Sequence, residues 1–192
     1  MTVARLLLFI IASASSALGQ GGQVSRGWGV FESRSQHFSV RYPASWHQMV
    51  AADGSVDHDT LSIINFPNSE IVSGVIIKKG GASIAALAVP VNAAPSNVRS
   101  LEDWIRWYEK HDAVLDDHVI PVVKGAPDAC RNLRRIVTRY EVGPNTFQIH
   151  TDYFCSTMHG LYVVLLTNWE GDPHQSALQD VALEVALSLR VR

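Results

Sequence analysis

The sequence predicts an α+β fold in which helices pack on a central, mainly antiparallel sheet. Segments with the period of half-buried strands come first, a helical segment interrupts them, further strands follow, and an amphipathic helix closes the chain. This order of elements is typical of an antiparallel sheet with helices packed on it. The chain has 192 residues, 47% apolar and 18% charged, so its composition is that of an ordinary globular protein and excludes disordered and collagen-like chains.

The strands before the helix are predicted from alternation and from the turn residues that end them. They are residues 38–42, an extended piece that begins at Trp46, and residues 61–66, 75–78 and 83–91. Trp46 follows a proline-containing turn and is expected to anchor the core. Gly80-Gly81 can take positive φ, so the last two segments are predicted to pair across a turn. This part of the chain is therefore predicted to be a β-meander.

The second half contains two helices with further strands between them. Ser100, followed three residues later by Asp103, predicts a helix start, and that helix is expected to end near His111. Strands are predicted at residues 114–123, 133–142, 147–155 and 161–168. Asp172 is expected to cap the last helix. The apolar stripe of that helix is Leu178, Val181, Ala182, Val185 and Leu189.

Residues 1–19 have the composition of a secretory signal peptide, with Arg5, an apolar run and small residues at Ala17 and Gly19. The run is shorter than the ~20 residues that a membrane anchor needs, so we expect cleavage and a soluble, secreted or periplasmic protein without an integral membrane segment. Residues 20–27 are then a flexible tail, and residues 28–192 form one domain. The net charge of −2 is too weak to attract nucleic acid, so no nucleic-acid partner is expected.

The chain has two cysteines, Cys130 and Cys155, and export makes a disulfide between them the natural prediction. The alternative is two buried free thiols. The hairpin register predicted below places Cys130 opposite His159, so the disulfide requires a bulge or a turn that brings Cys130 back toward Cys155.

No motif of a known catalytic class is present, because the chain lacks a G-x-S-x-G elbow, an H-E-x-x-H pair and a glycine-rich phosphate loop after a strand. We therefore expect a binding protein that is not an enzyme and needs no cofactor. Three short runs, residues 57–59, 116–118 and 150–152, place carboxylates near an imidazole. These are ligand types of divalent ions, so a metal-binding or metal-dependent exported protein is the alternative function, although such runs are also typical of solvated surfaces.

A polar surface is predicted on the hairpin of residues 133–155. A four-residue turn would place Arg139 directly opposite His150. One face of the hairpin would then gather the candidate binding residues Arg135, Arg139, His150 and Asp152. This face could receive an anionic ligand or an acidic loop of a partner; the alternative is a cross-strand charge ladder that faces water.

Apolar side chains outside the expected core are a second kind of candidate contact. Trp107 lies at the edge of its helix stripe and is a candidate binding residue. Leu183 and Leu187 lie on the outer side of the last helix. They could also meet a partner, unless the segment of residues 24–31, with Trp28, covers them.

Four segments, FSVRYPASWHQMV, SLEDWIRWYE, KGAPDACRNLRR and GLYVVLLTNWEGDP, occur here in an order that resembles the PsbP-like family. The resemblance extends over residues 38–190. It implies an α/β/α sandwich, the fold of the extrinsic PsbP subunit of photosystem II and of many small exported bacterial proteins. It is consistent with an accessory protein that binds another exported or envelope protein, and it supports fold more than function, since no site residue can be carried over from it.

Overall fold

The computed structural model describes residues 27–50, 54–66, 71–72, 75–76, 80–89, 100–111, 113–121, 132–157 and 160–192. The predicted signal peptide, residues 20–26 of the predicted tail, and Cys130 lie outside these ranges. Within them, no helix is long and apolar enough to cross a membrane.

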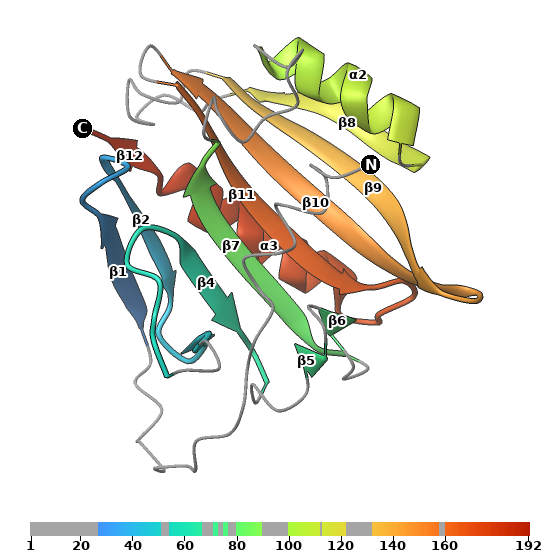
Figure 1. Ribbon diagram of the computed structural model, residues 1–192, viewed down its shortest axis with the longest axis horizontal. Coiled ribbons are helices and arrows are strands. Elements are labelled where there is room, and N and C mark those ends of the chain that lie inside the picture. Colours follow the sequence, from blue (N-terminus) through green and yellow to red (C-terminus); the bar gives the residue numbers. More distant parts are fainter. Residues whose placement is uncertain are drawn as a thin grey trace.

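A seven-stranded antiparallel sheet forms the centre of the molecule (Figure 1). Its strands lie side by side in the order β3 (His47–Gln48), β4 (Leu61–Ile64), β7 (Ala82–Ala88), β11 (Gly160–Trp169), β10 (Thr146–Thr157), β9 (Asn132–Gly143) and β8 (Ala113–Pro121). Strands β8 to β11 follow one another as a meander, and β11 then pairs with β7. The second half of the chain is thereby joined to the first, with β3 and β8 at the two edges of the described sheet.

Helices cover both faces of this sheet. On one face, α3 (Gln175–Leu187) packs together with a small antiparallel sheet of β1 (Trp28–Ser33), β2 (Phe38–Pro43) and β12 (Arg190–Val191). On the other face, α2 (Leu101–His111) lies beside β8 (Figure 1). A separate strand pair consists of β5 (Ile71–Val72) and β6 (Val75–Ile76). The α+β class, with helices on both faces of an antiparallel sheet, is confirmed.

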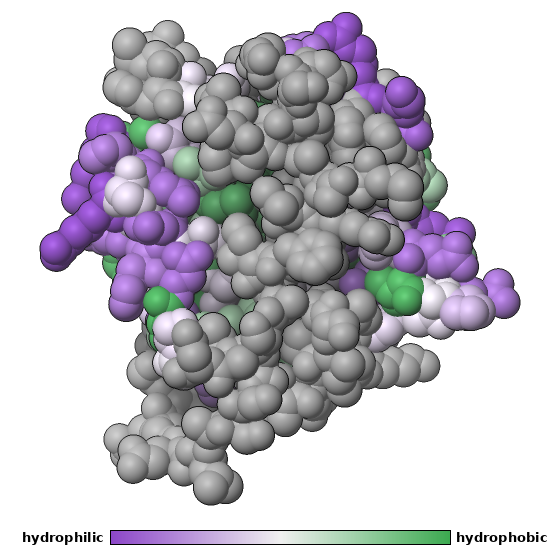
Figure 2. All heavy atoms as spheres, viewed as in Figure 1, coloured by the Kyte–Doolittle hydropathy of each residue, from purple (hydrophilic) through white to green (hydrophobic). Residues whose placement is uncertain are grey.

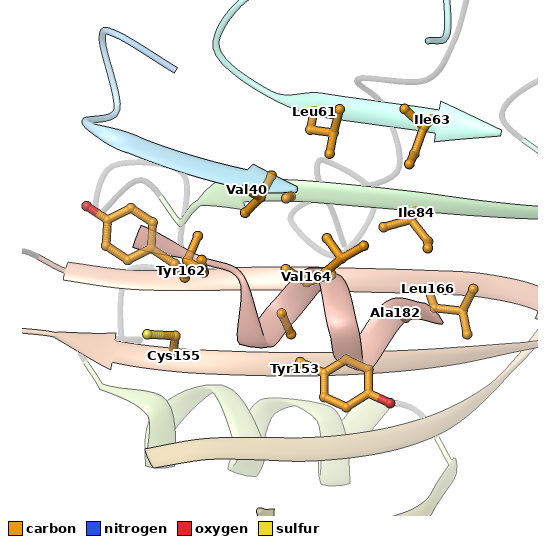
Figure 3. Packing of buried hydrophobic residues seen from close by; sticks show 14 of the residues in the cluster. Val40, Leu61, Ile63, Ile84, Tyr153, Cys155, Tyr162, Val164, Leu166 and Ala182 are labelled. Atoms are coloured by element: carbon orange, nitrogen blue, oxygen red, sulfur yellow. The ribbon is translucent and has the colours of Figure 1, made fainter. Parts of the chain in front are cut away.

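The larger core lies between the central sheet, α3 and the small sheet. Ile84, Val164 and Ala182 come from three different elements and are fully buried together in it (Figure 3). The Phe38 ring lies 6.0 Å from the Phe31 ring and 5.8 Å from the Tyr162 ring, measured between centroids. Burying a side chain of this size stabilises a fold by ~1.5–3 kcal/mol, so this cluster is the main source of apolar stabilisation.

A second core lies on the opposite face, under α2. Ile105 of the helix packs there with Ile136, Phe154 and Val163 of the sheet. Successive residues of a strand point to opposite faces, so a central strand that is covered on both sides buries neighbouring residues alike. Eight consecutive residues of β10, from Gln148 to Cys155, are accordingly buried.

The two helix starts behave differently. At α2 the Ser100 hydroxyl accepts a hydrogen bond from the Asp103 N–H at 3.2 Å, and the Asp103 carboxylate accepts one from the Ser100 N–H at 3.0 Å. The predicted capping box is therefore confirmed. The last helix begins at Gln175, three residues after the predicted cap, and His174 is its N-cap without a side-chain bond. The Asp172 carboxylate accepts a bond from the His174 N–H at 2.8 Å in the preceding turn.

The predicted pairing across Gly80-Gly81 is wrong, although Gly80 does take a positive φ of 83°. Strand β6 pairs with β5, whereas both edges of β7 are occupied by β4 and β11. Trp46 is half-buried at the rim of the larger core rather than a central anchor. Trp28, Leu183 and Leu187 are half-buried against the same core, so these leucines do not form an exposed patch.

Candidate functional site

The hairpin of β9 and β10 differs from the predicted register by one residue. The turn pairs Gly143 with Thr146, as predicted, but Phe147 then pairs with Glu141. Val142 is therefore an extra residue in β9, which is the definition of a β-bulge. From this point on, Arg139 lies opposite Ile149 and not opposite His150.

A slip of one residue moves the side chains of one strand to the other face relative to its neighbour. Arg135 and Arg139 consequently lie on the α3 side of the sheet, while His150 and Asp152 lie on the α2 side. The structure therefore does not bring the four predicted residues together as one surface. The physical reason is the bulge, which alternation alone does not reveal.

Arg135 belongs to a small charged group on the β8 end of the α3 side. Its guanidinium donates to the Asp116 carboxylate at 3.0 Å, and the same carboxylate oxygen lies 2.9 Å from His118 Nδ1. Asp116 and His118 share a face of β8, as predicted. The side chain of Arg135 is 20% exposed, so this arginine is largely engaged within the molecule.

The neighbouring arginines are engaged as well. Arg139 donates two hydrogen bonds to the Glu170 carboxylate, at 2.7 and 2.9 Å, and its guanidinium lies 3.3 Å from the centroid of the Phe147 ring. Arg134 likewise donates two hydrogen bonds to the Asp117 carboxylate, at 2.7 and 2.6 Å, and these bonds hold the pKa of Asp117 below its usual value. Such internal pairing favours a charge ladder over an open site for an acidic partner.

His150 occupies a different environment on the α2 side. The side chain is 7% exposed, its ring stacks on Tyr140 at a centroid distance of 5.6 Å, and its Nε2 has no hydrogen-bond partner in the part of the chain that the structure describes. Thr138 pairs with it across the strands and is also buried. Burial lowers the pKa of His150 to about 4, so the ring is neutral near pH 7.

The remaining predicted residues lie in three separate places. Asp152 is buried at 2% exposure on β10, next to His150 but not on the surface. Trp107 lies within α2, and its side chain is not among those that the structure describes. Cys155 is buried against the larger core, and none of the described cysteines is free. Because Cys130 lies outside the described ranges, its pairing with Cys155 stays a prediction.

The edge strand β8 is a surface that the sequence did not single out. It has a bulge at Leu115, between Val114 and Asp116. Leu115 and Val119 are 55% and 56% exposed, and only one other large apolar side chain of the described residues, Val30, is as open. Figure 2 shows hydrophilic side chains gathered on the same side of the molecule, over α2 and the tip of the β9–β10 hairpin. Alternation looks the same in a central and an edge strand, so no local signal identified this edge.

A cleft of about 490 Å³ opens at the other side of the central sheet, near β3. The described residues that line it are Val30, Phe31, Glu32, Arg34, Tyr42, Gln48, His58 and Asp59. Two of the residues in the predicted run 57–59 thus reach a concave surface. No group of three or more metal-ligating side chains is found among the described residues, and the other two predicted runs provide none.

Comparison with known proteins finds neither a matching family model nor a matching curated protein. Solved structures with a similar fold include cyanobacterial PsbP (CyanoP) from Synechocystis sp. PCC 6803, with a TM-score of 0.44 and 13% identity over 91% of this chain and 99% of that one. The Saccharomyces cerevisiae Ran-binding protein Mog1p has a TM-score of 0.48 and 11% identity over 87% of this chain and 96% of its own.

A Bacteroides thetaiotaomicron protein is also similar, with a TM-score of 0.45 and 15% identity over 87% of this chain. This chain spans about half the length of that protein, 49%. The likeness to these structures is one of fold. Membership of the PsbP-like family therefore stays a prediction from the four sequence segments.

Proposed function

We propose that this protein is an exported accessory protein that binds an extended segment of another exported or envelope protein along the outer edge of β8. It acts by binding rather than by catalysis. The proposal of export is based on the composition of residues 1–19. The observation that carries the binding role is the pair of exposed apolar side chains, Leu115 and Val119, on an edge strand of the sheet.

An edge strand presents N–H and C=O groups that a further strand can pair with. One side of β8 is paired with β9 from Ala113 to Pro121, and no described strand pairs with its other side. A peptide in an extended conformation could therefore add to the sheet, a recognised way of binding peptides in which the main chain supplies affinity and alternate side chains supply specificity.

The charges of β8 are compatible with such a partner. Asp116 and Asp117 are each held by an arginine of β9, so their carboxylates are neutralised within the molecule. Leu115 lies at the bulge, is exposed, and can contact an apolar side chain of the added strand.

Selection from a phage-displayed library of linear peptides tests this function. We expect peptides with alternating apolar residues to be enriched on the purified chain, and the bound peptide to slow amide hydrogen exchange in residues 113–121. The double variant Leu115→Asp with Val119→Asp should bind the selected peptides at least about tenfold more weakly, because it removes two apolar contacts.

Val30→Asp is the matched control, since Val30 is 62% exposed but lies on β1. This variant should bind the peptides as the wild type does. Equal binding by the β8 double variant, slowed exchange outside β8, or no enrichment of any peptide would each contradict the proposal.

A further inference from the structure

The cleft beside β3 has two walls that come from different parts of the chain. One wall is built by β1 and β2, which contribute Glu32 and Tyr42, together with Arg34 from the turn between them. The other wall is built by Gln48 of β3 and by the loop that carries residues 58 and 59. The cleft lies near the β3 edge and is thus separate from β8, which is the opposite edge of the central sheet.

The loop wall is held in place by Asp57. Its carboxylate accepts hydrogen bonds from the Asp59 N–H at 2.7 Å and the Thr60 N–H at 3.1 Å, which is an Asx-type turn. The Asp57 carboxylate is therefore engaged by the backbone of the two residues that follow His58. The two following side chains, His58 and Asp59, are exposed toward the cleft.

The charges that line the cleft are of both signs, and two of them are not engaged. The Glu32 carboxylate is paired with Arg192 at 2.8 Å. In contrast, neither the Arg34 guanidinium nor the Asp59 carboxylate has a hydrogen bond or ion pair within the described residues, and they do not pair with each other. A cation on one wall and an anion on the other are thus both available to a ligand.

Apolar and aromatic residues also line the cleft. Tyr42 of β2 pairs with Gly29 of β1, and a Cβ at Gly29 would lie 2.7 Å from the Tyr42 ring. Glycine therefore permits the close approach that places this ring in the cleft wall. Phe31 and Val30 complete the apolar lining, and the volume falls in the range of small-molecule sites.

We infer that this cleft binds a small zwitterionic solute of the amino-acid or short-peptide class. The ligand carboxylate binds Arg34, its ammonium group binds Asp59, and its side chain contacts the Tyr42 ring. A guanidinium and a carboxylate that line the same cleft complement a ligand that carries both charges, whereas a purely anionic or cationic solute would meet a like charge there.

Isothermal titration calorimetry of the full chain tests this inference. The probes are each proteinogenic L-amino acid and a series of dipeptides, together with their N-acetylated and C-amidated derivatives. We expect at least one zwitterion to bind and its two blocked derivatives to bind at least about tenfold more weakly. Arg34→Ala and Asp59→Asn should each weaken binding by about tenfold to a hundredfold, because each removes a charge-assisted contact.

Two matched variants away from the cleft separate this effect from a change in net charge. Arg106→Ala removes an exposed arginine of α2, and Asp180→Asn removes an exposed carboxylate of α3. Both should bind the zwitterion as the wild type does. The inference is overturned if no zwitterion binds, if the blocked derivatives bind equally well, or if Arg34→Ala and Asp59→Asn leave binding unchanged. None of these outcomes bears on peptide binding at β8.

Discussion

At the scale of single residues, His150 links the stability of the fold to pH. Its ring is buried on the sheet, stacks on Tyr140, and lacks a hydrogen bond at Nε2. Protonation would place a positive charge in this buried environment, and burial therefore lowers the pKa of His150 from 6.5 to about 4. In the unfolded chain the same imidazole takes up its proton near its ordinary pKa.

The unfolded state thus binds one more proton than the folded state between about pH 6.5 and pH 4. The free energy of unfolding should fall as the pH falls through this window, by roughly 3 kcal/mol in total. Urea unfolding near pH 7 and near pH 4.5 measures the change. His150→Gln should lose most of this dependence, whereas His47→Gln, which changes an exposed histidine, should keep it. A wild-type slope in His150→Gln would contradict the assignment.

Reversing the charge of Arg135 should cost more stability than reversing that of Arg139. Its guanidinium contacts Asp116, and its Nε is buried. Burial raises the pKa of Tyr153, and the positive charge of Arg135 partly offsets that effect. Arg135→Glu would place a carboxylate beside Asp116 and Tyr153, so it should lower the free energy of unfolding by about 1–3 kcal/mol.

Urea unfolding of Arg135→Glu and Arg139→Glu compares the two positions. The loss should be smaller for Arg139→Glu, because the Glu170 that it would approach lies at the surface and is 42% exposed. Equal losses would mean that burial of Arg135 does not matter. Unequal losses would show that the two arginines do not form one uniformly exposed charge ladder.

At the scale of elements, the start of α2 depends on one hydroxyl and one carboxylate. Ser100→Ala removes the bond that the Asp103 N–H donates, and loss of such a cap typically costs about 1 kcal/mol. Chemical denaturation should show this loss. Ser176→Ala is the control, because Ser176 lies in the first turn of α3 and does not cap it. A neutral Ser100→Ala would show that packing alone determines where α2 begins.

The elements themselves were largely predictable, but their register and pairing were not. Strand β2, helix α2 and the hairpin of β9 and β10 follow from alternation, a capping box and a turn. The bulge at Val142 depends on how two covered faces pack, since Ile136 and Ile149 are both buried although they point to opposite sides. When both faces of a strand are covered, its hydrophobic pattern cannot distinguish the correct pairing register from a register shifted by one residue.

At the scale of the whole molecule, the two proposed sites lie at opposite edges of one sheet. Which strand lies at an edge depends on the long connection from β7 through α2 to β8, and on the return of β11 to β7. Neither connection produces a local sequence pattern that would identify the edge strands. The exposure of Leu115 and the cleft at Asp59 therefore required the structure, whereas the α+β class required only the order of elements.

Export is a prediction about the mature chain as a whole. The apolar run after Arg5 is too short to anchor the protein, and the small residues at Ala17 and Gly19 suit a signal peptidase. Protein secreted from an exporting host should therefore have an intact mass that begins at Gln20. A mature mass that still includes Met1 would show that residues 1–19 are not a cleaved signal.

An exported chain folds in an oxidising compartment, where two cysteines can be joined. Cys155 of β10 lies in the larger core and pairs with Leu133 of β9. Cys130 lies three residues before Leu133 in the sequence. A bond between them would close a loop of intermediate length and stabilise the fold by about 3 kcal/mol. We expect denatured, unreduced protein to take up no alkylating reagent and reduced protein to take up two equivalents, as measured by mass spectrometry. Two labels without reductant would show that both thiols are free. Reductant should lower the thermal midpoint of the disulfide-bonded protein, and it should leave the midpoint unchanged if the thiols are free.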